Sequence, residues 1–376
     1  MKTNIDDLID NKYFSAIIIN ISNLQEKSKN LILEIIKVLN SNNINLLQLK
    51  QNIIKGILDV SPSLRSLCWK ILLKYIPLNI EIWEQFLDKK REEYELLKKK
   101  IYKKKHLKIK NHPLDINTNL DLDIINKDNK LNDIINRDLN RTRTEIPFFN
   151  EPSKKNNKET NYDVLHRILF IYAKEHSNIY YIQGLNEIVA IIYYVFSQDK
   201  NPYFYNESEA DTYFCFENLL KEFKNFYKED FYNSENGIKK QIDYIKFMVK
   251  NLEHDIYYSF KELKIDIYLF VFRWYSLLFS QEFNLNCVMK LWDNIFSQNN
   301  KYEYLNILVL CALKLKKNDI ISKDLSKIMN SLQTFDDLDV EKMLYLIEKV
   351  KMDLREKEFK LGEENFEKFK KSEDYI

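Results

Sequence analysis

Apolar residues recur at intervals of three and four positions over most of this chain, which is the spacing of one buried face of an α-helix. Clear examples run from Leu64 to Tyr75, from Tyr162 to Glu175 and from Gly184 to Phe196. Long stretches of the chain lack Gly and Pro, the residues that punctuate architectures built from strands and turns. The pattern therefore predicts an all-α protein.

The same spacing predicts helices in the rest of the chain, from short ones within 12–58 to a final one that begins near Asp339. The others are expected at 80–109, 209–226, 237–263, 267–279, 287–296 and 305–315. Two polar segments, near 111–134 and 150–161, are expected to be surface loops. Asn and Asp, which favour turns and disfavour helix interiors, supply ten of the twenty residues at 115–134.

The helix expected at 80–109 becomes strongly basic toward its end, with eight lysines between Lys98 and Lys110. Such a run usually forms a solvated helix face, and the alternatives are contact with an anionic membrane surface or with RNA. The whole chain has a formal net charge of only +2, from 58 Lys and Arg against 56 Asp and Glu. Because this balance gives no global reason to expect nucleic acid, we predict no nucleic-acid partner and leave peripheral membrane contact open.

Composition excludes several classes of site. The four glycines, at positions 56, 184, 237 and 362, lie too far apart to build a P-loop or a dinucleotide-binding turn. The five histidines show neither HxxxH nor HExxH spacing, and no cysteine lies near one. The sequence therefore predicts no metal site and no cofactor of its own.

The cellular compartment is predicted from three features. The four cysteines are widely separated, with no CxxC pair, and are expected to be reduced thiols. The N-terminus is acidic where a signal peptide would be basic and then apolar. The longest apolar stretches, 185–196 and 305–315, are shorter than the ~20 residues of a membrane span. We expect a cytoplasmic protein, which membrane contact would place on the periphery of endomembranes.

Arginine is scarce and locally clustered. Only eight of the 58 basic residues are arginines, and three of these, Arg137, Arg141 and Arg143, fall within seven positions. Since lysine supplies most of the positive charge, this cluster indicates a site that needs a planar group with several fixed donors. On a helical turn Asp138 and Arg141 would lie at i and i+3, so the carboxylate could hold the guanidinium in position. The alternative is an ordinary surface ion pair, which contributes almost nothing to stability.

A second polar segment, Tyr180-Tyr181-Ile182-Gln183-Gly184-Leu185-Asn186-Glu187, stands immediately before an apolar helix. By propensity it forms a turn and a helix start. Together the two segments resemble the paired signatures IxxDxxRT and YxQG[ML]N of TBC-domain GTPase-activating proteins for Rab-type GTPases. The matching positions are Ile135, Asp138, Arg141, Thr142, Tyr181, Gln183, Gly184 and Asn186.

The resemblance extends over most of the chain. Leu64-Arg65 with Trp69 is similar to the LRxxxW segment of the family, residues 273–283 to its RWxxxLxSxEF segment, and residues 292–293 to the WD that follows. Further segments are similar to the branch of TBC-domain family member 13. The tryptophans are expected to be core anchors.

The resemblance implies a two-lobed helical TBC domain at 56–315. N-terminal helices at 1–55 would precede it, and C-terminal helices with a charged tail would follow at 316–376. It also implies a GTPase activator rather than an enzyme that turns over a substrate of its own, with a role in vesicle traffic. GTP and Mg²⁺ would arrive with a GTP-bound Rab-type partner.

The resemblance further implies two catalytic side chains. Arg141 would be an arginine finger, and Gln183 a second finger that replaces the water-orienting glutamine of the GTPase. Two residues 42 positions apart cannot act together from one helix, so the fold must bring them together. The supporting residues are expected to be Asp138, Arg65, Tyr181, Gly184, Asn186 and Thr142. The alternative is a non-catalytic TBC-like adaptor that binds a Rab GTPase or another trafficking protein; the sequence fixes neither the Rab nor the oligomeric state.

Overall fold

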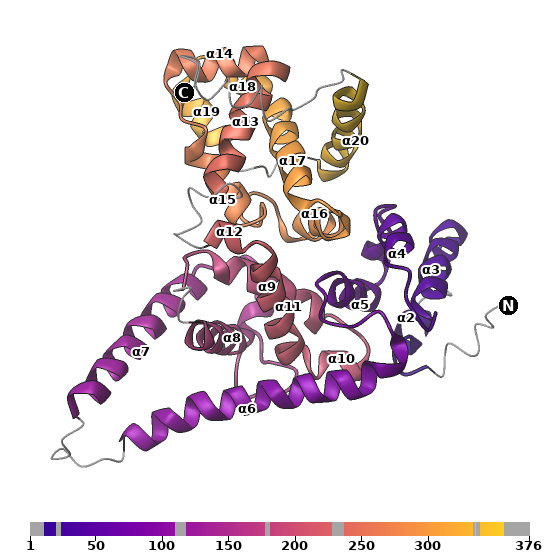
Figure 1. The fold of residues 1–376 in the computed structure, drawn as a ribbon, viewed down its shortest axis with the longest axis vertical. Coiled ribbons are helices and arrows are strands. Elements are labelled where there is room, and N and C mark those ends of the chain that lie inside the picture. Colours follow the sequence, from indigo (N-terminus) through magenta and orange to yellow (C-terminus); the bar gives the residue numbers. More distant parts are fainter. Residues whose placement is uncertain are drawn as a thin grey trace. The chain divides into compact units, whose positions relative to one another are not determined.

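The structure is a computed structural model that describes residues 11–19, 24–109, 118–176, 181–227, 237–333, 335 and 339–356, with the main chain only at 57, 103–109, 118–124, 225, 353 and 355–356. The chain folds into two compact units, Met1–Glu222 and Phe223–Ile376, called the first and the second unit below. Helices dominate both (Figure 1), and the described residues contain no β-strand. The prediction of an all-α protein is confirmed.

The first unit contains most of the helices that were expected before residue 222. Its elements are α2 (Ser15–Ile19), α3 (Glu26–Leu39), α4 (Leu46–Ile53), η2 (Ile57–Val60), α5 (Pro62–Leu72), η3 (Ile80–Ile82), α6 (Trp83–Ile109), α7 (Thr118–Leu139), η4 (Pro147–Asn150), α8 (Asn161–Glu175), α9 (Leu185–Ser197), α10 (Pro202–Tyr205) and α11 (Ser208–Glu222).

Helix α9 forms the centre of the first unit. It is apolar around almost its whole circumference, and only Tyr194 among its residues is not buried. A helix of this kind must be enclosed by others, and α9 packs against α5, α8 and α11. Helix α7 packs against α8 and α9, while the long α6 passes α8 and α11 (Figure 1). Helix α9 is therefore enclosed by other helices of the first unit.

Local capping explains where two of these helices begin. The Ser61 side chain accepts a hydrogen bond from the N–H of Leu64, and Pro62 occupies the first turn of α5, where it loses no helical hydrogen bond. Thr160 and Asp163 form a reciprocal capping box at the start of α8. Both starts fall within two residues of the sequence prediction.

A buried charge cluster joins α5, α6 and α11. The fully buried Lys70 Nζ donates to Ser66 Oγ at 2.7 Å and lies 3.6 Å from Asp211 Oδ2. Asp211 also accepts from Tyr75 OH at 2.9 Å and from Arg91 Nε at 3.2 Å. Burial lowers the pKa of Lys70, and the negative charge of Asp211 partly opposes this shift. Each buried charge thus has a partner, as burial in a low dielectric requires.

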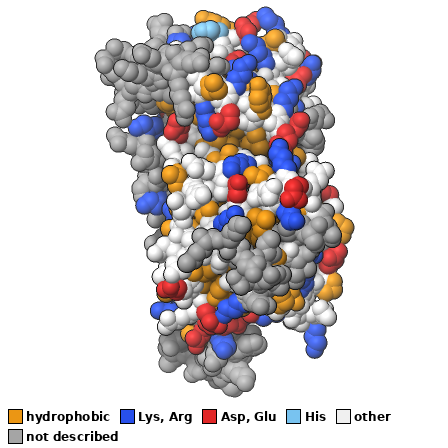
Figure 2. Space-filling view, turned by 90° about the vertical axis from the view of Figure 1, so that its right-hand side faces the viewer, with side chains coloured by type: hydrophobic (Ala, Val, Ile, Leu, Met, Phe, Trp, Pro, Cys, Tyr) orange, Lys and Arg blue, Asp and Glu red, His pale blue; other side chains and the backbone are white. Residues whose placement is uncertain are grey.

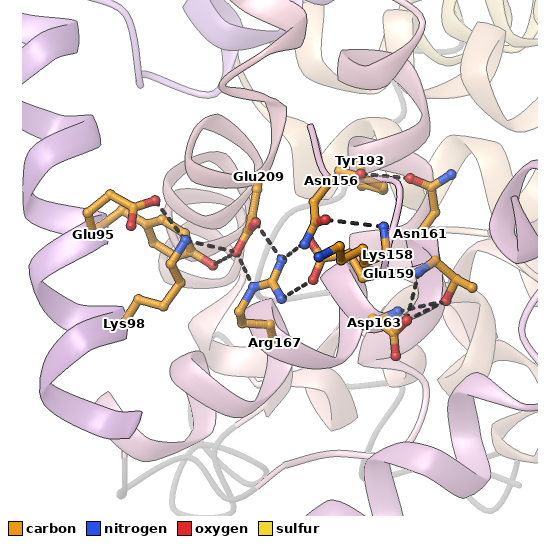
Figure 3. A network of polar contacts seen from close by, with 12 residues as sticks. Glu95, Lys98, Asn156, Lys158, Glu159, Asn161, Asp163, Arg167, Tyr193 and Glu209 are labelled. Atoms are coloured by element: carbon orange, nitrogen blue, oxygen red, sulfur yellow. Dashed lines mark hydrogen bonds and ion pairs between the residues drawn. The ribbon is translucent and has the colours of Figure 1, made fainter. Parts of the chain in front are cut away.

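A second network, which is partly buried, connects α6, α8 and α11 in the same unit (Figure 3). Arg167 donates to Glu209 at 2.6 Å and to Glu159 at 2.7 Å, and Lys98 pairs with Glu95 at 2.7 Å. Burial alone would raise the pKa of Glu209, but the hydrogen bonds and the charge of Arg167 outweigh it and lower that pKa. This network is scaffolding, because none of these residues lines the candidate site described below.

The loop predicted near 111–134 is wrong from Thr118 onward, because α7 spans Thr118–Leu139; residues 111–117 lie outside the described part. Ile125, Leu131 and Ile135 recur on the face of α7 that is turned inward, and Lys174 of α8 pairs with Asp128. Packing of this stripe on α8 overrides the weak helix propensity of Asn and Asp. The segment at 150–161, in contrast, contains no helix between η4 and α8, as expected.

The second unit is built around α17 (Lys301–Leu315), which packs against α13 (Ile238–Leu252), α15 (Tyr268–Ser276), α16 (Leu285–Ser297) and α20 (Val340–Glu356). Its other elements are α12 (Lys224–Tyr227), α14 (His254–Leu263), α18 (Lys317–Ile320) and α19 (Leu325–Ser331). The helix expected at 237–263 is divided at Glu253, whose φ of −135° is not helical.

Three observations bear on the remaining sequence predictions. Trp69, Trp274 and Trp292 are fully buried, so the prediction of core anchors is confirmed. In the described residues no helix combines the length and the apolar character needed to cross a membrane. Of the lysine run at 98–110, Lys98 and Lys100 pair with acidic side chains, and the side chains from 103 onward lie outside the description. Membrane contact stays a prediction.

Candidate functional site

The segment that contains Arg141 follows directly after α7. The Arg141 side chain is 62% exposed, and its Nη2 donates to Asp138 Oδ1 at 2.6 Å. The Asp138 side chain is only 4% exposed, so the i, i+3 pair predicted from the sequence joins an exposed cation to a buried carboxylate. A charge-assisted hydrogen bond to a fixed partner restricts an otherwise flexible guanidinium. This geometry differs from that of an ordinary surface ion pair.

The segment that contains Gln183 precedes α9. Gly184 is the N-cap of α9 and has a φ of 101°, a left-handed conformation that disfavours any residue with a Cβ. The Gly184 N–H donates to Asn186 Oδ1 at 3.1 Å, which fixes the turn. Gln183 itself is exposed, and its side chain has no hydrogen bond to another described residue. Its amide is therefore accessible to solvent just before the start of α9.

The fold brings the two segments together at one open pocket. The pocket has a volume of about 390 Å³ and is lined by Ile134, Arg137, Asp138, Arg141 and Gln183. All five belong to the first unit. Arg141 and Gln183, 42 positions apart in the sequence, thus share one opening to solvent. Their juxtaposition follows from the packing of α7 against α9.

A chain of buried hydrogen bonds connects the two segments beneath this pocket. Tyr181 OH donates to Asp138 Oδ2 at 2.9 Å, so one carboxylate contacts both Arg141 and the Gln183 segment. Asn186 Nδ2 donates to Thr142 Oγ1 at 2.8 Å, and Thr142 Oγ1 donates to the carbonyl oxygen of Asp138 at 2.8 Å. Buried polar networks whose members are satisfied rigidify a structure.

Burial, and then the charge and hydrogen bond of Asp138, raise the pKa of Tyr181 well above its usual value. The phenol therefore keeps its proton and remains a donor throughout the physiological pH range. As a result, the contact between Tyr181 and Asp138 does not depend on pH under these conditions.

Sequence reasoning assigned no role to two contacts at this site. Arg143 Nε donates to Glu187 Oε2 at 3.2 Å, and both side chains are at least 92% buried. Tyr162 OH donates to the carbonyl oxygen of Thr142 at 2.5 Å. The arginine cluster was a signal for the first contact, because Arg143 belongs to it without matching a family motif.

Arg65 lies elsewhere in the first unit. It is buried in α5 and pairs with Asp59, and it is not among the residues that line the pocket. Its support of Arg141 stays a prediction. In the part of the chain that the structure describes, no group of three or more His, Cys, Asp or Glu side chains could hold a metal ion.

Comparison with protein families now decides the classification. The model of the Rab-GTPase-TBC domain matches residues 62–321, which is more than half of the chain. The chain belongs to the Rab-GTPase-TBC domain family. TBC1 domain family member 13 of Homo sapiens is 30% identical over 352 residues, covering 75% of this chain and 88% of that protein. The resemblance to TBC domains, and to this branch, is thus confirmed.

Other proteins with TBC domains are also similar to this chain. GTPase-activating protein GYP1 of Saccharomyces cerevisiae is 27% identical over 274 residues, covering 68% of this chain and 37% of that protein. Among solved structures, the Ypt/Rab-GAP domain of Gyp1p matches with a TM-score of 0.68 and 24% identity, over 85% of this chain and 96% of that one. The Chlamydomonas flagellar RabGAP TBC domain matches with a TM-score of 0.58 and 17% identity, over 92% and 95% of the two chains. These structures establish the TBC fold.

Within this TBC domain, Arg141 and Gln183 contribute a guanidinium and an amide to the pocket, which the side chains of Arg137 and Asp138 also line. Arg141 presents a permanent positive charge with several N–H donors, only one of which is directed at Asp138 in the hydrogen bond described above. Gln183 presents an amide that can donate and accept at the same time. Neither the guanidinium nor the amide is a nucleophile or a general base, and the carboxylate that lines the pocket, Asp138, accepts hydrogen bonds from Arg141 and Tyr181.

Proposed function

We propose that this chain stimulates GTP hydrolysis by a Rab-type GTPase, with Arg141 as an arginine finger and Gln183 as a glutamine finger. The observation that carries the proposal is that these two side chains line the same open pocket while their neighbours are tied together underneath. GTP and Mg²⁺ arrive with the GTP-bound partner. The chain acts in the cytoplasm, in the regulation of vesicle traffic.

Arg141 would act on the charge that develops during phosphoryl transfer. In GTP hydrolysis negative charge is spread over the phosphoryl oxygens, and an arginine finger accelerates the reaction by about 10³ to 10⁵. At about 1.36 kcal/mol per decade, this corresponds to roughly 4 to 7 kcal/mol of transition-state stabilisation. Lysine has one compact charge and cannot reproduce the planar fork of donors.

Gln183 would orient the attacking water. Its amide oxygen accepts a hydrogen bond from water while its NH₂ group donates to a phosphate oxygen, which places the nucleophile in line with the bond to be broken. The left-handed Gly184 and the hydrogen bond from its N–H to Asn186 hold the backbone of the turn in place. Positioning of this kind lowers the entropy that must be lost in the transition state.

The test is phosphate release from a panel of GTP-loaded Rab GTPases, with catalytic amounts of the full chain. We expect stimulation of at least one Rab, and a loss of most of it, about 10²-fold or more, in both Arg141→Ala and Gln183→Ala. Arg141→Lys should also lose most of the stimulation. Full activity of Arg141→Lys would contradict the finger role.

Binding experiments separate this proposal from the alternative of a non-catalytic adaptor. Because Arg141 and Gln183 are exposed, their alanine variants should fold as the wild type does, which circular dichroism can verify. They should still bind the GTP-loaded Rab. Saturable binding of the wild type with no change of hydrolysis rate across the whole panel would support the adaptor and exclude the GTPase-activating function.

A further inference from the structure

The solvent-facing side of α7 is unusually basic where it approaches the pocket. Ten residues between 126 and 141 are exposed: Asn126, Lys127, Asn129, Lys130, Asp133, Ile134, Asn136, Arg137, Asn140 and Arg141. They include four cations and one acid, whereas the whole chain has 58 basic against 56 acidic residues. On the face of the molecule shown in Figure 2, positive and negative side chains are interspersed. The charge of α7 is therefore a local feature.

The cations of this helix lie along one side of it, in a stripe. Lys127, Lys130, Ile134 and Arg137 follow one another at intervals of three, four and three positions, which places them along a single face of α7, and Arg141 comes just after the helix ends at Leu139. Ile134 and Arg137 line the same pocket as Arg141. The stripe thus leads directly into the candidate site, and the 40% exposed Ile134 adds an apolar patch at the rim.

Three of these cations lack acidic partners in the described part of the chain. No ion pair is formed there by Lys127, Lys130 or Arg137, and Arg137 Nε donates only to the main-chain oxygen of Asp133, at 3.2 Å. Asp133 flanks the stripe, yet its carboxylate forms no ion pair with it. On the opposite face, by comparison, Asp128 is paired with Lys174. The positive charge of the stripe is therefore available to a partner.

We propose that Lys127, Lys130 and Arg137, here called the α7 basic stripe, dock acidic side chains of the GTPase that border its bound nucleotide. This inference rests on the proposed function. The occupant follows from position and charge, because a GTPase that presents its GTP to Arg141 must lie beside the stripe. Complementary charge at a rim steers association and selects among partners.

The stripe should affect encounter rather than chemistry. Rim charges change association rates and their dependence on salt, whereas finger residues change the rate of the bound complex. The double variant Lys127→Gln, Lys130→Gln, at two stripe positions that do not line the pocket, should therefore raise KM for the GTP-loaded Rab about fivefold at low salt, with kcat within about twofold of wild type. The difference should shrink between about 50 and 200 mM NaCl, because salt screens exposed charges.

The matched control removes the same charge elsewhere in the first unit. Lys27 and Lys37 are exposed on α3, far from α7 in Figure 1, and form no ion pair with a described residue. Their double Gln variant should leave KM and kcat unchanged. Gln suits exposed helix positions, and circular dichroism verifies folding of both variants. If the control variant raises KM as much as the α7 variant does, the loss of net charge is the cause of the effect, and the proposal is overturned.

The remaining outcomes are each decisive. If the wild-type chain stimulates no Rab, the proposed function fails and this inference falls with it. If the wild type is active and the α7 variant keeps its KM, the stripe is not a docking surface, although the proposed function stands. A loss of kcat with unchanged KM would place the stripe in the chemistry instead. Loss of binding to phosphatidylserine vesicles, with KM intact, would assign the stripe to the membrane and overturn the proposal.

Discussion

The contact between Arg143 and Glu187 should set the spacing between the two proposed fingers. Arg143 lies two residues after Arg141, and Glu187 lies four residues after Gln183 in the first turn of α9. Their side chains are 7% and 8% exposed, and Nε and Oε2 are 3.2 Å apart. Arg143 also has a φ of 45°, a left-handed conformation that costs a non-glycine residue about 1 to 2 kcal/mol. A strained residue held by a buried ion pair beside a functional site suggests a positioning role.

The expected magnitude follows from this burial. Removing one member of a buried ion pair destabilises a protein by about 3 to 5 kcal/mol, because a charge then remains in a low dielectric without that partner. We expect the lower end, about 3 kcal/mol, for Arg143→Met, since both side chains keep a small exposed fraction. The double variant with Glu187→Met should cost less than the sum of the two single variants, by about 1 to 3 kcal/mol of coupling.

Two measurements test the prediction. Denaturant unfolding of the wild type, both single variants and the double variant gives the coupling free energy. Phosphate release from a stimulated GTP-loaded Rab, at a temperature where every variant is folded, gives kcat and KM. Because the contact holds both finger segments, kcat should fall about tenfold or more in each single variant while KM changes little. The conservative Arg143→Lys should recover part of kcat.

The matched control is the pair of Arg167 and Glu159 in the network of Figure 3. It is also an arginine–glutamate pair of the first unit, with exposed fractions of 18% and 20% and a distance of 2.7 Å. Neither residue lines the pocket. Arg167→Met should lower stability to a comparable extent and leave kcat of the folded protein unchanged. Equal kcat values for the Arg143 and Arg167 variants, or a coupling free energy near zero, would refute the positioning role.

Three further predictions concern the same unit. Gly184→Ala should lower stability by about 1 to 2 kcal/mol and remove most of the stimulation of GTP hydrolysis. Gly56→Ala is the control: Gly56 has a φ of 82° with open space around it, so this variant should lose similar stability and keep its activity. Unfolding and phosphate-release assays compare the two variants. Tyr181→Phe should lower kcat several-fold with KM intact, because it removes the hydrogen bond to the carboxylate that holds the finger; unchanged kcat would speak against this contact. Burial, and then nearby carboxylates, raise the pKa of Tyr75 and Tyr94, so above about pH 10 these phenols lose their protons in the unfolded chain before they do in the folded protein. The contribution of these two tyrosines to stability should therefore be constant below that pH and fall above it by up to about 1.4 kcal/mol per pH unit for each tyrosine. The melting temperature as a function of pH measures this loss.

Much of the fold was predictable because helical periodicity is strong in this chain. The bounds of α8 and α9 agree with the sequence within one or two residues, since a capping box and a glycine turn mark their starts. Helix α7 was missed because its Asn and Asp residues signal turns. Its inward-facing apolar residues, Ile125, Leu131 and Ile135, are too few to give a clear helical pattern, and packing on α8 stabilises the helix.

The candidate site was predictable in part. The motifs that contain Arg141 and Gln183 indicated which residues to examine, but only packing of α7 on α9 brings them to one pocket. The contact between Arg143 and Glu187 spans 44 positions, and no local pattern marks both of its ends. The α7 basic stripe could not be predicted for another reason. Residues that recur every three or four positions share a face only in a helix, and most of this segment was predicted to be a loop.

The finger role proposed for Arg141 sets two conflicting requirements, exposure and restricted motion. Arg141 has to be exposed, yet an exposed arginine retains rotamer freedom worth about 2 kcal/mol, which would oppose association. Its bond to Asp138 restricts it before the partner arrives, and Asp138 is held in turn by Tyr181. The restriction therefore depends on the buried carboxylate of Asp138, whose side chain is only 4% exposed. Substitutions of Asp138 or Tyr181 should weaken catalysis without changing any group that contacts GTP, and this distinguishes a pre-organised finger from one that is ordered only on binding.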